Sequence, residues 1–257
     1  MKSTSLIFLN VKLSPSGMYA MRTVPASKMR LALKYPPPTT IIGALTYPIF
    51  RIMNWRDEVL NNNKNSILPS YERIKDIFKY VSARINGKLF TYGTLLRIHR
   101  MYNKKVDFAI TSSPMILAYG EERNLFELAY LIDLDAAEKH GITKEKIIRA
   151  AWGITRIGSR ESVFSVDEVV VHSPTIKQTT KAETSFAFEY SESFNINGNG
   201  EFKKVVKWND GKLSDYTSAK WVPYFYPQDK VTVTSDSSFN VIEVDQESLV
   251  MGEISVE

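Results

Sequence analysis

The sequence contains no cysteine, and this absence excludes several kinds of site at once. Without a thiol the chain cannot form disulfides, zinc–thiolate sites, iron–sulfur clusters or a cysteine nucleophile. Histidine is scarce as well, because His99, His140 and His172 are the only three and stand in no H-x-x-x-H spacing. A histidine-based metal site is therefore not expected, and the sequence predicts no cofactor.

Long hydrophobic runs are also missing. No apolar stretch approaches the roughly 18 to 20 residues that a membrane-spanning helix requires, and the N-terminal LIFL is too short for the core of a secretory signal. With 257 residues, of which 44% are hydrophobic, the chain can instead bury a sizeable core. We expect a cytoplasmic globular protein with no membrane partner.

Acidic residues are absent from the first 56 positions. That segment contains eight basic residues, whereas the rest of the chain has 25 basic and 28 acidic residues. From Asp229 to the end the balance reverses, with seven acidic residues against Lys230 alone. This distribution predicts a polyanion near the N-terminal segment, and either a protein partner or simple solvation at the acidic end.

Hydrophobic periodicity predicts an α+β fold. Alternating apolar residues indicate strands at 6–13, 126–134 and 163–171, and helical spacing indicates helices at 39–53 and 143–152. With strand pairing between the helices, this is the ferredoxin-like (RRM-like) βαββαβ order over residues 1–172. Residues 173–257 are rich in short strand signals and turns, and we predict a smaller all-β C-terminal module there.

A long hairpin is predicted at about 91–111, where two β-like runs flank Asn103-Lys104-Lys105. Its outer part is basic, with one acidic residue, Asp107. Either these cations grip a phosphate backbone, or they protect exposed strand edges from pairing. The basic and histidine residues of this segment are Arg97, His99, Arg100, Lys104 and Lys105.

The stretch YPPPTTIIGAL at 35–45 places three prolines directly before a helical run. Proline fixes φ and disfavours helix for its predecessor, so we expect a stiff approach and a helix that starts no earlier than Thr39. Thr39 or Thr40 is the expected N-cap, and Pro48 should bend or shorten the helix. Such an aimed N-terminus either binds phosphate or only caps a core helix.

A second stretch, GITRIGSR at 153–160, has glycines spaced as in a phosphate-binding loop. It lacks the lysine and follows a helix, so it is not one. What remains is a glycine turn with Ser159 between Arg156 and Arg160. Paired arginines can bind phosphate, although Arg160 and the adjacent Glu161 can equally form a structural ion pair.

Together, YPPPTTIIGAL and ITRIGSRESVFSV (154–166) resemble the Cas-five family of CRISPR-associated proteins, part of the RAMP superfamily, and in particular its archaeal type I-A form. The resemblance covers residues 1–172. It implies a subunit of the Cascade antiviral defence complex that binds the 5′ handle of the guide RNA (crRNA). The implied partners are crRNA, the backbone (Cas-seven-like) and large subunits, and target DNA indirectly.

The resemblance also implies where RNA would bind. The helix end at Thr39 and Thr40 would face handle phosphates, and the basic residues of the 14–38 loop would close the groove. The hairpin would act as a thumb between guide nucleotides and the neighbouring subunit, and Arg156, Ser159 and Arg160 would lie near the same groove. The basic residues of the loop are Arg22, Lys28, Arg30 and Lys34.

One branch of the family is a nuclease that processes guide precursors, so an enzyme remains the alternative. A metal-independent endoribonuclease needs a general base near a 2′-hydroxyl and a cation for the developing negative charge. His99, Tyr92, Tyr102 and Lys104 can supply these groups. No convincing equivalent of the branch's catalytic tyrosine, lysine and histidine is present, so we predict a non-catalytic subunit.

Overall fold

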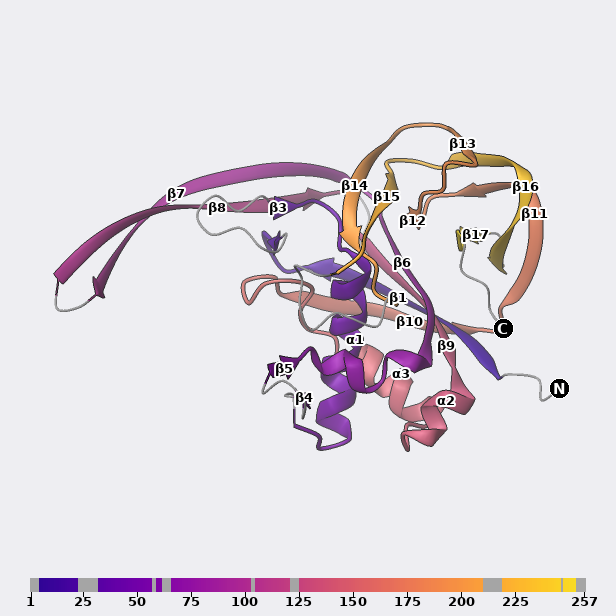
Figure 1. The fold of residues 1–257 in the computed structure, drawn as a ribbon, viewed down its shortest axis with the longest axis horizontal. Coiled ribbons are helices and arrows are strands. Elements are labelled where there is room, and N and C mark those ends of the chain that lie inside the picture. Colours follow the sequence, from indigo (N-terminus) through magenta and orange to yellow (C-terminus); the bar gives the residue numbers. More distant parts are fainter. Residues whose placement is uncertain are drawn as a thin grey trace.

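The structure is a computed structural model that describes residues 5–22, 32–56, 59–61, 66–102, 105–120, 125–209, 219–245 and 247–252. For residues 22, 59–61, 66–68, 94–102 and 105–113 it describes the backbone alone. Strands predominate over helices, and Figure 1 shows a compact body from which one long hairpin extends.

A four-stranded antiparallel sheet forms the centre of the body. Its strands are β1 (Leu6–Pro15), β6 (Phe78–Ile85), β9 (Phe126–Asp133) and β10 (Phe164–His172), in the order β10-β1-β9-β6. Along the chain, helix α1 (Pro38–Ile52) follows β1, and helix α3 (Lys144–Trp152) lies between β9 and β10. The strands predicted at 6–13, 126–134 and 163–171 and the helices predicted at 39–53 and 143–152 therefore each have a counterpart in the structure.

The two faces of this sheet have different covers. Odd-numbered residues of β1 and even-numbered residues of β9, such as Leu9 and Tyr130, share one buried core with α1 and α3. Their neighbours Phe8 and Leu131 point the other way and pack against Phe186 and the last strands of the chain. Every residue of β9 is buried because both faces are covered, which the expectation of one buried face did not anticipate.

The described residues of the C-terminal part lie mainly in strands. In one sheet β16 (Val231–Val244) pairs with β11 (Thr175–Thr184), β13 (Phe194–Asn197) and β17 (Glu247–Val250). In another, β15 (Trp221–Pro227) lies between β12 (Phe188–Glu189) and β14 (Gly200–Val206). Val206 and Trp208 enter the core that contains α1 and α3, so the C-terminal strands fold directly against the N-terminal part.

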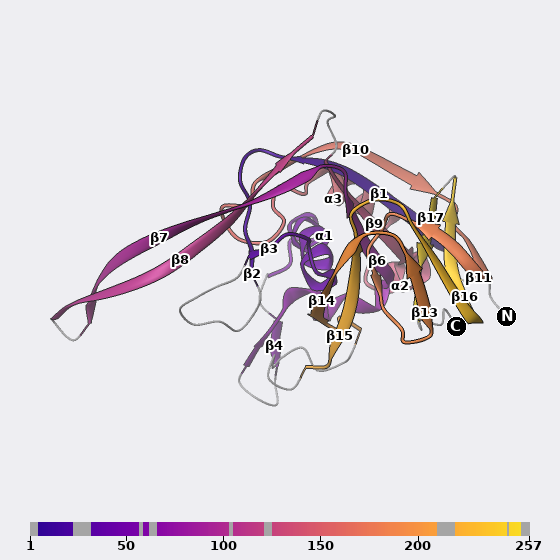
Figure 2. The same cartoon turned by 90° about the horizontal axis from the view of Figure 1, so that it is seen from above.

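The predicted hairpin is confirmed and is longer than expected. Strands β7 (Lys88–Tyr102) and β8 (Lys105–Tyr119) pair with each other along their whole length. Figures 1 and 2 both show it projecting away from the body. The base of the hairpin contacts the body, where Tyr19 and Ile116 exchange backbone hydrogen bonds of 2.9 and 2.7 Å.

Helix α1 begins one residue earlier than predicted, and the predicted cap is wrong. Pro38 is the first helical residue, and Pro37 is the N-cap with φ −70° and ψ 156°, without a side-chain cap hydrogen bond. Proline suits the first helical position because its missing N–H has no helical partner there. Thr39 and Thr40 thus lie inside the first turn. Pro48 does not shorten the helix, which continues to Ile52.

Several shorter elements also differ from expectation. The sequence pattern did not indicate the small strand pair β4 (Val59–Asn61) and β5 (Ser66–Leu68), which is followed by the 3₁₀ turns η1 (Ser70–Arg73) and η2 (Lys75–Ile77). Within the expected loop after β1, β2 (Met21–Arg22) pairs with β3 (Ala32–Leu33). Among the short strand signals predicted after residue 172, the one at 186–190 corresponds only to β12. Two- and three-residue strands leave no detectable periodicity, so sequence patterns miss them.

The caps of the later helices follow ordinary rules. Thr143 caps α3 by accepting a 3.4 Å hydrogen bond from the Lys146 N–H, and Gly153 ends that helix, in agreement with the helix predicted at 143–152. Asp133 caps the short helix α2 (Leu134–Lys139) through a 2.9 Å bond from the Ala136 N–H. None of the described helices is long and apolar enough to cross a membrane.

Candidate nucleic-acid interface

A groove with a cavity volume of about 330 Å³ lies between α1 and the turn that follows α3. It brings together the two sequence motifs that were singled out above, although more than 100 positions separate them in the chain. One wall comes from α1 and the other from the 155–158 segment. The lining residues are Thr40, Gly43, Ala44, Tyr47, Thr155, Arg156 and Gly158.

The first wall is a single stripe of α1. Thr40, Gly43, Ala44 and Tyr47 recur at helical spacing, while Ile41, Leu45 and Ile49 on the opposite side are buried in the core. A Cβ atom built on Gly43 would meet no atom within 4 Å, so the groove is open above this position. Pro48 has no N–H to donate to the carbonyl of Ala44, and this acceptor of the groove wall therefore lacks its usual helical donor.

The second wall is a turn held by buried isoleucines. Ile154 and Ile157 are 1% and 0% exposed, whereas Thr155 and Arg156 between them are exposed and face the groove. An isolated bridge pairs Arg156 with Val163, and the Phe164 N–H donates a 2.9 Å hydrogen bond to the Thr155 carbonyl. Backbone pairing with Val163 and Phe164 therefore fixes the position of the segment that contains Arg156.

The same turn is hydrogen-bonded to the backbone of Ala20. The Ser159 N–H donates to the Ala20 carbonyl over 3.0 Å, and the fully buried Ser162 hydroxyl both accepts from the Ala20 N–H and donates to its carbonyl. Gly158 has φ +100°, and a Cβ there would lie 2.9 Å from the Ala20 carbonyl oxygen. Only glycine permits this approach without strain.

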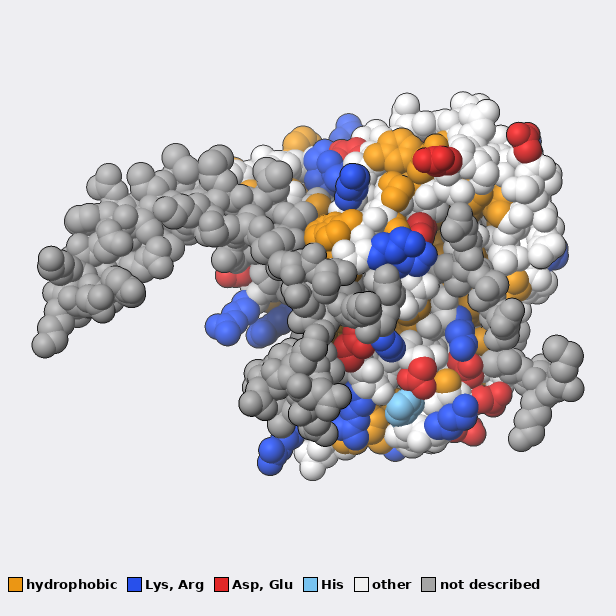
Figure 3. All heavy atoms as spheres, in the orientation of Figure 1, with side chains coloured by type: hydrophobic (Ala, Val, Ile, Leu, Met, Phe, Trp, Pro, Cys, Tyr) orange, Lys and Arg blue, Asp and Glu red, His pale blue; other side chains and the backbone are white. Residues whose placement is uncertain are grey.

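The charge of the groove suits an anion. No carboxylate is among its described lining residues, and within the described part of the chain no carboxylate forms an ion pair with Arg156 or Arg160. Tyr47 is 50% exposed, and the guanidinium carbon of Arg51 lies 4.9 Å from its ring centroid. In Figure 3, Lys and Arg side chains protrude beneath the hairpin, where Figure 1 draws the loop between α3 and β10. Cations beside an open aromatic ring are a common surface for single-stranded nucleic acid.

The other predicted RNA contacts are distributed differently. Lys34 does not line the groove, because its ammonium group pairs with Glu201 at 2.6 Å in the C-terminal part. Thr39 lies next to Thr40 in the first turn of α1 and Ser159 beside Gly158, so both are adjacent to the groove. The side chain of Arg22 and the whole of Lys28, Arg30 and Lys104 lie outside the described residues.

The backbone of the hairpin places the remaining predicted contacts in its outer half. Register pairs Arg97 with Ile110, His99 with Phe108 and Arg100 with Asp107, and Lys105 starts the returning strand opposite Tyr102. The backbone register therefore places these positions along the hairpin, beyond the part of it that lies next to the body. Their side chains are among the undescribed ones, so their role in binding stays a prediction.

The described residues that line the groove include no histidine and no carboxylate. Asp133 and Asp135, two carboxylates close together in the sequence, lie at the start of α2, where Asp133 acts as the cap. Among the described residues, no three His, Asp or Glu side chains lie close enough to hold a metal ion.

Sequence reasoning did not identify Gly43, Tyr47, Thr155 and Ser162 as site residues. Gly43 could have been identified from the sequence, because an isolated glycine inside a helical pattern costs stability. Such a glycine suggests that another group approaches the helix closely at that position. Ser162 could not have been identified in this way, because its hydrogen bonds with Ala20 join residues 142 positions apart in the sequence.

Comparisons with known proteins support the family resemblance. No protein-family model matches the chain. A Saccharolobus solfataricus protein named "CRISPR system aCascade subunit Cas5 1" is 25% identical over 192 residues, and the match covers 70% of each chain. A second protein of that organism, "CRISPR-associated protein Cas5 3", is 26% identical over 191 residues, again 70% of each chain. The predicted resemblance to the Cas-five family is thereby confirmed.

A solved structure has a similar fold. A CRISPR protein from Archaeoglobus fulgidus superposes with a TM-score of 0.61 over 95% of this chain and 98% of its own, at 17% sequence identity. The mixed fold with mostly strands is therefore shared with a CRISPR protein, C-terminal strands included.

Proposed function

We propose that this chain is a non-catalytic RNA-binding subunit of a type I (I-A-like) CRISPR Cascade complex, and that the groove between α1 and residues 155–158 receives the 5′ handle of the crRNA. The observation that carries the proposal is the meeting of both sequence motifs in one groove without lining carboxylates. The name of one relative, an aCascade subunit, supports the assignment to this complex.

Each wall of the groove offers a different contact to RNA. Arg156 presents a guanidinium group for a phosphate, and Tyr47 an exposed ring on which a base can stack. The Ala44 carbonyl, without its donor at Pro48, is an acceptor for a 2′-hydroxyl or a base N–H. Thr39, Thr40 and Ser159 supply polar groups around the entrance.

The architecture suits a position at the end of a filament. The sheet order β10-β1-β9-β6, with α1 and α3 on one face, supports a ferredoxin-like domain over 1–172, followed by a β-rich module over 173–257. The projecting hairpin then serves as a thumb toward a neighbouring backbone subunit, with Arg97, His99, Arg100, Lys104 and Lys105 toward RNA. The large subunit, and target DNA through it, complete the set of proposed partners.

Replacing Arg156 by glutamine is expected to weaken binding of a repeat-derived handle RNA three- to tenfold. Loss of one phosphate contact should also reduce the slope of log K against log salt by about 0.7 for single-stranded RNA. Fluorescence anisotropy at several salt concentrations measures both quantities.

The matched control is Lys181→Gln, which removes an exposed cation from β11 in the C-terminal sheet and should change neither quantity. Equal effects of the two substitutions would mean that RNA responds only to net charge. In that case the groove would not be the handle site.

A further inference from the structure

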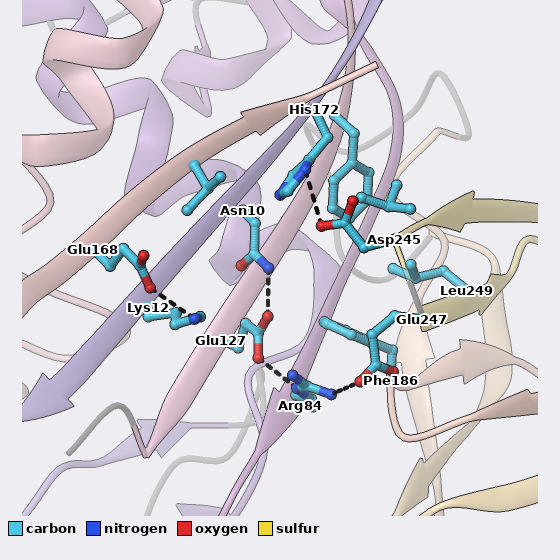
Figure 4. Close-up of a pocket in the computed structure, with 13 residues that line it drawn as sticks. Asn10, Lys12, Arg84, Glu127, Glu168, His172, Phe186, Asp245, Glu247 and Leu249 are labelled. Atoms are coloured by element: carbon cyan, nitrogen blue, oxygen red, sulfur yellow. Dashed lines mark hydrogen bonds and ion pairs between the residues drawn. The ribbon is translucent and has the colours of Figure 1, made fainter. Parts of the chain in front are cut away.

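A second cleft lies on the face of the central sheet opposite to α1 and α3, and its cavity volume is about 340 Å³. Its floor comes from β10, β1, β9 and β6, and its wall from Phe186 and the turn between β16 and β17 (Figure 4). The turn belongs to the acidic C-terminal stretch, which the RNA-binding proposal leaves without a role. The cleft is therefore separate from the groove.

A row of alternating charges crosses the floor of this cleft. In the strand register Glu168 lies beside Lys12, Lys12 beside Glu127, and Glu127 beside Arg84. Lys12 and Glu168 pair at 2.7 Å, Glu127 pairs with Arg84, and Arg84 reaches Glu247 in the wall at 2.7 Å. Burial lowers the pKa of the Arg84 guanidinium, but Glu127 and Glu247 together raise it, and the net result is a raised pKa.

The row leaves acceptors without donors. Glu127 is 2% exposed, and both of its oxygens are used, one by Arg84 and the other by the Asn10 amide nitrogen. The Asn10 side-chain oxygen and Oε2 of Glu247 are buried and have no hydrogen-bond partner among the described residues. Both residues line the cleft from different sides, as Figure 4 shows. A buried acceptor without a donor is costly, so a ligand that donates hydrogen bonds is favoured here.

The net charge of the lining points the same way. Four carboxylates line the cleft against the two permanent cations Lys12 and Arg84. His172 adds a positive charge only when protonated and lies 3.2 Å from Asp245. This lining disfavours a phosphate and favours a cation, the opposite of the groove. The apolar residues Phe8, Phe186 and Leu249 border the cleft and can cover the stem of a long side chain.

We propose that this cleft binds the guanidinium group of an arginine side chain presented by a partner protein. A planar guanidinium has five donors and no acceptor, so it can satisfy Asn10, Glu247 and a further carboxylate at once. An ammonium group is a compact point charge and matches spread acceptors less well. The acidic C-terminal stretch thus provides a protein-docking site on the face that RNA does not use.

A titration of the isotope-labelled full chain tests this assignment. N-acetyl-arginine amide is added and followed by amide NMR, with N-acetyl-citrulline amide as an uncharged probe of the same shape. We expect saturable shifts at Asn10, Glu127 and Glu247 with arginine and at least fivefold weaker effects with citrulline. Glu247→Gln, which keeps an acceptor for Arg84, should weaken arginine binding at least threefold, whereas Glu192→Gln at an exposed turn should not.

Three results would overturn the proposal. Equal shifts from arginine and citrulline would show that charge is not recognised. Unchanged arginine affinity in Glu247→Gln would place binding elsewhere. Spermidine binding as tightly as the arginine probe at the same resonances would mean that the cleft accepts any amine, and the specific role of a guanidinium would be wrong.

Discussion

Replacing Gly43 by leucine is expected to stabilise the fold by about 0.8 kcal/mol and to weaken handle-RNA binding about tenfold. Glycine inside a helix is less favourable than leucine by roughly this amount. Apart from the helix's own backbone, no described atom lies within 4 Å of a Cβ at this position, so a larger side chain has room to extend into the groove. Thermal unfolding and RNA binding, measured on the same preparation, should therefore change in opposite directions.

Gly43→Ala is the matched control for this experiment. Alanine gives a similar or slightly larger helix stabilisation, about 1 kcal/mol, but adds only a methyl group to a groove of about 330 Å³. We expect its RNA affinity to stay within threefold of the wild type. If leucine stabilises the chain and leaves RNA affinity unchanged, RNA does not enter the groove along α1.

Replacing Gly158 by alanine is expected to lower the free energy of unfolding by about 2 to 3 kcal/mol. A residue with a Cβ is strained at φ +100°, and the added atom would lie 2.9 Å from the Ala20 carbonyl oxygen and 3.0 Å from Cγ of Met21. The hydrogen bonds between the turn and Ala20 must then rearrange, and the turn that contains Arg156 shifts with them. Chemical denaturation measures the stability loss, and RNA binding should fall well below that of Arg156→Gln.

Gly17→Ala separates this effect from general glycine effects. Gly17 lies in the loop after β1, and its added Cβ would meet nothing within 4 Å. Its replacement should change stability by less than about 0.5 kcal/mol. A Gly158→Ala variant as stable as Gly17→Ala would contradict the described close approach of the turn to Ala20.

Much of the central sheet could be predicted, because its strands keep strict alternation. Ile7, Leu9, Val11 and Leu13 all enter the helix-side core, as expected from β1 alone. The α3 cap at Thr143 was also predictable, because capping depends on residues that are adjacent in the sequence. These features are local, and local patterns are readable without knowledge of the fold.

One local feature was predicted wrongly, and features that depend on distant residues could not be predicted. The start of α1 follows from the fit of Pro38 to the first helical position, which a rule against proline in helices obscured. The second face of β9 is buried because strands more than 50 positions later cover it. The charge row from Glu168 to Arg84 depends on strand register, and no spacing in the sequence reveals it.

Some residues of the candidate groove were predicted from the sequence, and others were not. Thr40 and Arg156 were identified from the two motifs, and the structure places both in one groove. Gly43 and Tyr47 were overlooked because an apolar helix pattern was sufficient to explain α1 as a core element. Lys34 was grouped with neighbouring cations by charge, yet its partner Glu201 is 167 positions away.

The most direct test is to incubate the purified full chain with labelled repeat RNA in EDTA and analyse the same samples on native and denaturing gels. The proposal predicts a shifted band on the native gel and intact RNA on the denaturing gel. Competition by an RNA without the handle should be at least tenfold weaker. A discrete cleavage product that disappears in His99→Ala would instead identify a metal-independent processing nuclease and contradict the non-catalytic role.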